Sequence, residues 1–325
     1  MSGDMHDQLT KYLTDAHAIE EQALQQPKTA PGMAGEPQLA EALREHEAET
    51  EVHERLVREC LEARDAQPSK LKDVLGRAGA FGFLLFARVQ PDTPGKLAAH
   101  AFSYEHLEVA AYELLAGFAD RAGDVETAAA ARRIREDERA MADRIAGLLD
   151  ATVDASLAEL DPDDLQEQVV KYLADAHAIE AQAITLLEKG PEIAGSPTLE
   201  GIYADHLAET HDHQELVAER LAALGGAPNR LKDAAMRLGG LNWGMFFQAQ
   251  PDTPHKLAAF AYAFEHLEIA SYEQLKRVAQ RAGDEQTVEL AERILSSERE
   301  AASRLSGAFG AAIEASLEAA GVAHR

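Results

Sequence analysis

The sequence predicts an all-α protein built from two similar halves, and two observations carry this prediction. Ala, Leu, Glu and Arg dominate the chain, and no stretch shows the sustained two-residue alternation of β-branched residues that is typical of strands. Lys11-Tyr12-Leu13 also returns as Lys171-Tyr172-Leu173, a shift of 171 − 11 = 160 residues. A repeat of this length indicates a duplicated domain rather than an array of short units.

The same shift relates the two halves without a gap, which predicts domains at residues 1–160 and 161–325. It maps the segment 105–108, Glu-His-Leu-Glu, onto 265–268, and the segment 90–94, Gln-Pro-Asp-Thr-Pro, onto 250–254. Apolar positions kept in both copies are explained by packing. Polar positions kept on a core-facing stripe need another reason, because burying them is costly.

Caps and prolines predict four long helices in each half. The first half is expected to contain helices over about 7–26, 37–64, 92–122 and 124–157. Pro27 closes the first helix, and Pro37 suits the first turn of the second. Asp124 caps the fourth helix, and a further Asp-Pro pair at 161–162 opens the second half.

A long apolar segment, 71–89, connects the second and third helices, and its copy again carries aromatic residues such as Trp243 and Phe246. Two antiparallel helix pairs joined by a long crossover define the ferritin-like form of the four-helix bundle. The predicted fold class is therefore two ferritin-like bundles with a crossover between helices two and three. The crossover packs either on its own bundle or on the other half or another subunit, and both alternatives stay open.

The composition excludes several functional classes. A net charge of −26 argues against nucleic acid and anionic membranes as partners. The one cysteine, Cys60, becomes Arg220 in the copy, so no repeated site uses it. The chain begins without a secretory pattern, and no apolar stretch is long enough to span a bilayer. A cytoplasmic location is expected.

Chemistry-bearing residues recur at helical spacing in both halves. His46, Glu49 and His53 follow an i, i+3, i+7 pattern, as do Glu105, Glu108 and Tyr112. Several carboxylates converging in a dry core would be destabilising as bare anions, whereas divalent cations would neutralise them. Mixed carboxylate and imidazole donors suit iron or manganese. The candidate metal ligands are Glu20, His46, Glu49, His53, Glu105, Glu108 and Glu138, with counterparts Glu180, His206, Glu209, His213, Glu265, Glu268 and Glu298.

Three strings, 18–22 (AIEEQ), 46–50 (HEAET) and 105–112 (EHLEVAAY), resemble the YciE/YciF group of ferritin-like proteins, a bacterial family linked to stress responses. The resemblance covers nearly all of each half. It implies a ferritin-like bundle with a dimetal centre, often assembled as a dimer. It also assigns the ligand role to all the candidates above except His53 and His213, which rank as outer partners or alternative ligands.

The sequence departs from the usual ferritin pattern at two points. His46 precedes Glu49 on the second helix, and the fourth helix has no histidine near Glu138, which leaves the nitrogen donor of the second metal open. His17 is expected to hydrogen-bond a ligand carboxylate rather than to bind metal. Tyr112 is either a phenol that donates to such a carboxylate or an aromatic residue of the bundle core.

The leading functional hypothesis is a metal-binding protein with two divalent ions per half, iron or manganese, arranged as an internal pseudo-dimer that can also form homo-oligomers. Its chemistry would be redox work on oxygen or peroxide in stress defence. The alternative is a metal-free, stress-induced structural or protein-interaction bundle whose aromatic crossovers are the working surface. A metal-dependent hydrolase or transferase fits less well, because carboxylates outnumber histidines.

Overall fold

The computed structural model describes residues 5–24, 30–67, 93–228 and 253–322, and the regular secondary structure in these ranges is entirely helical, with no strand. The all-α prediction is confirmed. The chain divides into two compact units, residues 1–156 with 320–325, and residues 157–319. The predicted boundary at residue 160 stays a prediction. The predicted crossovers fall within 68–92 and 229–252, outside the described residues.

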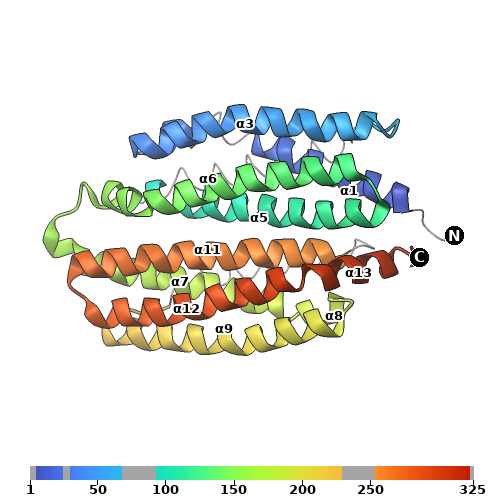
Figure 1. Cartoon of the computed structure of the whole chain (residues 1–325). Coiled ribbons are helices and arrows are strands. Elements are labelled where there is room, and N and C mark those ends of the chain that lie inside the picture. Colours follow the sequence, from blue (N-terminus) through green and yellow to red (C-terminus); the bar gives the residue numbers. More distant parts are fainter. Residues whose placement is uncertain (1–4, 25–29, 68–92, 229–252, 323–325) are drawn as a thin grey trace. The chain divides into compact units, whose positions relative to one another are not determined.

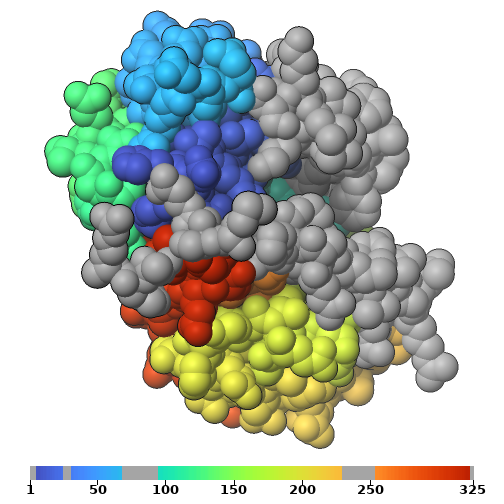
Figure 2. All heavy atoms as spheres, turned by 90° about the vertical axis from the view of Figure 1, so that its right-hand side faces the viewer, coloured from blue at the N-terminus to red at the C-terminus, as the bar shows by residue number. Residues whose placement is uncertain are grey.

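The first unit contains four long helices: α1 (Met5–Ala23), α3 (Pro37–Glu62), α5 (Thr93–Ala122) and α6 (Val125–Leu157). The short α2 (Ala30–Met33) precedes α3. Helix α1 packs against α3 and α5 (Figure 1). Ion pairs join α6 to α3 and to α5. Side chains of α1 and α3 meet along their shared boundary in the space-filling view (Figure 2).

The second unit repeats this arrangement with α7 (Leu165–Leu187), α9 (Pro197–Ala223), α11 (Thr253–Ala282) and α12 (Glu285–Gly307). Helix α7 packs against α9 and α11, and α12 packs against the same two helices, which closes a four-helix ring (Figure 1). Two short helices, η1 (Pro162–Asp164) and α8 (Gly190–Ile193), precede α7 and α9 respectively. Each ring places one stripe of every long helix in the interior.

The fourth helix differs between the halves. Helix α6 is continuous, whereas its copy is divided into α12 and α13 (Phe309–Ala319) at Ala308. Gly307 and Gly310 flank this break, and the first half has a glycine only at the position equivalent to Gly307. Glycine weakens a helix interior by its backbone freedom, and two within one turn explain why the copy does not stay continuous.

Caps read from the sequence explain where the helices start. The predicted cap Asp124 accepts a hydrogen bond from the backbone N–H of Thr127 at 3.0 Å, and Arg64 pairs with the same carboxylate. Asp284 caps α12 in the same way at 3.1 Å. At the start of α3, Gly35 has φ +61, and a Cβ there would lie 2.7 Å from Cγ of Pro94. Only glycine fits this close approach without strain.

The core of each bundle is apolar and well packed, with residues such as Leu9, Leu13, Leu39, Ile134 and Ile145 almost fully buried. Among the described residues no helix is long and apolar enough to cross a bilayer. The interior also holds many acidic side chains, and these define the site.

Candidate metal centre

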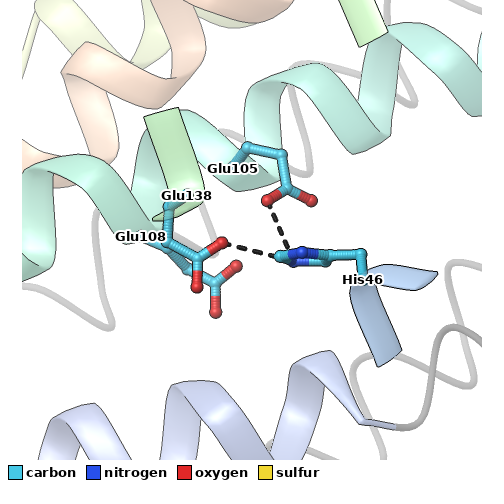
Figure 3. Close-up of side chains that lie close together, drawn as sticks. All are labelled: His46, Glu105, Glu108 and Glu138. Carbon is cyan, nitrogen blue, oxygen red and sulfur yellow. Dashed lines mark ion pairs between the residues drawn. The ribbon is translucent and has the colours of Figure 1, made fainter. Parts of the chain in front are cut away.

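Four side chains from three helices converge in the core of the first bundle. His46 comes from α3, Glu105 and Glu108 come from α5, and Glu138 comes from α6 (Figure 3). One donor atom from each lies within 4.8 Å of the others, and all four residues are buried. Nε2 of His46 is 3.2 Å from Oε2 of Glu105 and 3.2 Å from Oε2 of Glu138.

A second group shares a residue with the first. Glu20 of α1, His53 of α3 and Glu138 form a buried set whose donor atoms also lie within 4.8 Å of one another. Nδ1 of His53 is 2.7 Å from Oε1 of Glu138. The two oxygens of Glu138 therefore face two different groups.

Most of the oxygen and nitrogen atoms that could bind a metal ion in these groups lack a hydrogen-bond partner. Both carboxylate oxygens of Glu108 and of Glu138 are buried and make no aligned hydrogen bond, although the oxygens of Glu138 lie within ion-pair distance of both histidines. Nε2 of His46 and Nδ1 of His53 are also buried and make no aligned hydrogen bond. Buried polar atoms are almost always satisfied, and a cluster of exceptions needs an explanation such as an ion.

Burial dominates the electrostatics of the carboxylates. It raises the pKa of Glu20 to about 8 and that of Glu105 to about 7, and it raises the pKa of Glu108 well above its ordinary value. Glu138 is the exception, because the histidines outweigh the effect of burial and hold its pKa at about 2. Burial also opposes the charged form of His46, but Glu105 and its other acidic neighbours raise its pKa overall. Without an ion, this core must take up protons near neutral pH.

The structure brings together six of the seven predicted ligands of the first half and leaves Glu49 apart. The side chain of Glu49 is 56% exposed and lies on the outer side of the imidazole, where its Oε2 accepts from Nδ1 of His46 at 3.0 Å. This hydrogen bond fixes the ring and leaves Nε2 to face the carboxylates. A carboxylate behind a ligating histidine is a common outer partner of metal sites.

Three further residues surround the groups. Tyr112 is fully buried in the bundle core and its hydroxyl also donates to Oε1 of Glu20, so it is both a core aromatic and a donating phenol. Nε2 of His17 pairs with Glu54 of α3 at 3.0 Å, and these two residues form a separate group with Glu21. Asp137 was not singled out as a functional residue by sequence reasoning, and its Oδ2 lies 3.3 Å from Nε2 of His53.

The second half repeats both groups. His206, Glu265, Glu268 and Glu298 form the set of four, and Glu180 and His213 share Glu298 with it. Nε2 of His206 lies 3.0 Å from Glu265, and Nδ1 of His213 lies 2.8 Å from Glu298. Tyr272 donates to Glu180 as Tyr112 does to Glu20. Glu209 lies at the Nδ1 side of His206 and does not belong to either group, so the same predicted ligand falls outside the groups in both halves.

Comparison with known proteins agrees with this duplicated arrangement. No curated protein matches the chain. The family described as Domain of unknown function (DUF892) matches twice, over residues 4–158 and 164–318, which is consistent with the resemblance to the YciE/YciF group. Buried His/Glu groups that could hold metal ions occur in both matched regions. The chain therefore belongs to the DUF892 family and contains two tandem copies of its domain.

Proposed function

We propose that each half binds a pair of divalent metal ions, iron or manganese, in its bundle core. The observation that carries the proposal is the pair of donor groups joined through one carboxylate, Glu138 in the first half and Glu298 in the second. Two adjacent groups with a shared residue match the geometry of two ions held by terminal and bridging carboxylates. An isolated salt bridge would not need the unpartnered oxygens of Glu108 and Glu268.

The donor inventory supports two ions rather than one. Each half offers four glutamates and two histidines, the same set that dimetal carboxylate bundles use. The distribution differs, because both histidines come from one helix, α3 or α9, rather than from two. Four ionised carboxylates are balanced by two divalent ions, so the filled core would be neutral. Neutrality removes the cost of burying the carboxylates as anions.

Redox work on oxygen or peroxide is the reaction class that this centre fits best. Bound iron or manganese would supply electrons by cycling between the divalent and trivalent states. The protein's own residues would hold the ions in a dry core, with Glu20 fixed by the hydroxyl of Tyr112 and His46 fixed by Glu49. A role in stress defence and a cytoplasmic location belong to the same proposal, and the acidic composition is compatible with both.

Elemental analysis of protein expressed with added iron and manganese tests the proposal. We expect about four ions per chain, two for each half. The variant Glu138→Gln/Glu298→Gln removes the shared carboxylate of each half with little change in shape, and it should lose most of the metal. Glu136→Gln/Glu292→Gln is the matched control, since both residues are exposed on the same helices.

Circular dichroism decides whether a variant that loses metal is still folded. A folded wild-type protein that contains no metal and takes up neither ferrous nor manganous ion under anaerobic conditions would refute the proposal. That result would favour the metal-free structural or interaction bundle. Retention of all metal by Glu138→Gln/Glu298→Gln would also contradict it, because the shared ligand would then be dispensable.

A further inference from the structure

The two centres have the same inner donors but different outer partners. In the first half a carboxylate stands behind each histidine: Glu49 accepts from Nδ1 of His46 at 3.0 Å, and Asp137 lies 3.3 Å from Nε2 of His53. Both carboxylates are solvent-exposed by about half, at 56% and 44% of their side-chain surface. Each hydrogen bond fixes which ring nitrogen faces the core and makes that nitrogen a stronger donor.

The second half weakens the first of these outer contacts. Oε2 of Glu209 accepts from Nδ1 of His206 at 3.2 Å, but the same oxygen pairs with Arg304 at 2.5 Å. In the first half the equivalent arginine, Arg144, instead pairs with Glu45 at 2.5 Å. The copy has Asp205 at the position of Glu45, one methylene shorter. Arg304 therefore shares the charge of the carboxylate that polarises His206.

The second outer carboxylate is missing from the copy. Ser297 stands where the first half has Asp137, so no carboxylate occupies that position behind His213. The first half therefore has a carboxylate behind each of its two histidines. In the second half the counterpart of Glu49 is paired with Arg304, and the counterpart of Asp137 is a serine. Both changes act in the same direction, since each reduces the negative charge that reaches the metal donors.

Given the proposed function, on which this inference rests, we propose that the two centres are unequal: the first half binds divalent metal more tightly and favours the trivalent state more strongly. Asp137 and Arg304 are the positioning residues that set the difference. At limiting metal the first half fills first, and the second half holds ions that exchange more readily. The chain would then combine one permanent and one exchangeable centre of the same inner composition.

The test uses full-length chains in which one centre is disabled. Glu298→Gln leaves only the first centre, and Glu138→Gln leaves only the second. Manganese(II) is titrated into each chelator-treated protein, and the free ion is followed by its paramagnetic resonance signal. We expect the first centre to bind about 10-fold or more tightly than the second, in the range found when such outer partners are removed.

Reciprocal substitutions then assign the cause. In the first-centre protein, Asp137→Ser should weaken manganese binding by about 10-fold, and Asp137→Asn should weaken it in the same direction because the charge is lost. In the second-centre protein, Ser297→Asp and Arg304→Gln should each tighten it. The variant Arg133→Gln, an exposed residue of α6, is the control and should change nothing.

A reduction potential provides a readout that a purely structural role would not move. With iron bound, the first centre should have the lower potential, and a 10-fold difference in preference for the trivalent state corresponds to about 59 mV. Equal affinities and equal potentials for the two centres would overturn the inference, as would an Asp137→Ser variant that is folded and unchanged. If neither centre binds manganese or iron, it is the proposed function that fails.

Discussion

The stability of the metal-free protein should fall as the pH rises from 6.5 to 8. Glu20 is buried and its pKa is raised from 4.5 to about 8, so the folded protein keeps a proton there that the unfolded chain has lost. In this interval the folded state binds more protons than the unfolded state, and stability therefore decreases with increasing pH. The raised pKa of Glu108 acts in the same direction.

The lower limit of the interval is set by other histidines. His100 and His106 are half-buried, and the loss of solvation lowers the pKa of each from 6.5 to about 4. Between about pH 4 and 6.5 these rings are charged mainly in the unfolded chain, so their effect on stability has the opposite sign and rises with pH. Well above 6.5 they are neutral in both states. Glu138, with a pKa of about 2, is ionised throughout the interval.

The magnitude follows from the width of the interval. One proton held between pH 6.5 and 8 changes the free energy of unfolding by about 1.4 kcal/mol per pH unit, or about 2 kcal/mol for Glu20 alone. The raised pKa of Glu180 in the second half adds to this figure. His46 adds to it as well, because its raised pKa gives a stabilisation that is complete below 6.5 and is lost at higher pH.

Urea unfolding followed by circular dichroism at four pH values between 6.5 and 8 measures the effect on chelator-treated protein. The metal-loaded protein should lose this dependence, because ions rather than protons neutralise the carboxylates. The variant Glu20→Gln/Glu180→Gln should reduce the dependence of the metal-free protein and leave the part that Glu108 and His46 contribute. A free energy of unfolding that stays constant or rises over this interval in the metal-free wild type would refute the reasoning.

Three further substitutions test separate features. Tyr112→Phe removes the hydrogen bond to Glu20 and should cost about 1–2 kcal/mol in the metal-free protein and about 10-fold in metal affinity; unchanged values in both assays would contradict its role. Asp124→Ala removes the cap of α6 and should lower the free energy of unfolding by about 1–2 kcal/mol, with Asp120→Ala as an exposed control. Gly35→Ala should destabilise by about 1–3 kcal/mol in the same urea assay, because φ is +61 there and Pro94 lies against the missing Cβ.

Most of the fold could be predicted because its signals are local. The caps and prolines at positions such as Pro37 and Asp124 placed the helix starts within a residue or two of those observed. The sequence does not predict the break between α12 and α13, because Gly307 has a counterpart in the uninterrupted α6 and Gly310 is one of several differences between the copies in this segment. An added glycine lowers the stability of the continuous helix, but a comparison of the two sequences does not show whether this is enough to interrupt it.

The site shows where spacing alone misleads. An i, i+3, i+7 spacing predicts one shared helix face, but an α-helix turns by about 100° per residue. On that basis His53 lies about 20° around the helix from His46, whereas Glu49 lies about 60° away. The structure follows this difference, since both histidines point into the core and Glu49 reaches the outer side of His46. The histidine ranked lower by resemblance thus faces the core, and the glutamate does not.

A comparison of the two halves identifies residues that both halves require. It does not identify residues that act in only one half. The repeat points to Glu138 because the second half has Glu298 at the same place. It does not point to Asp137, because Ser297 replaces that residue in the second half. Yet Asp137 lies against a histidine of the core group, and its loss in the copy coincides with the pairing of Arg304 to Glu209. Two independent changes that reduce the negative charge behind the same pair of histidines are the pattern expected if the second centre is tuned apart from the first. The positions that differ between the copies are therefore where a division of labour between the two halves should be sought.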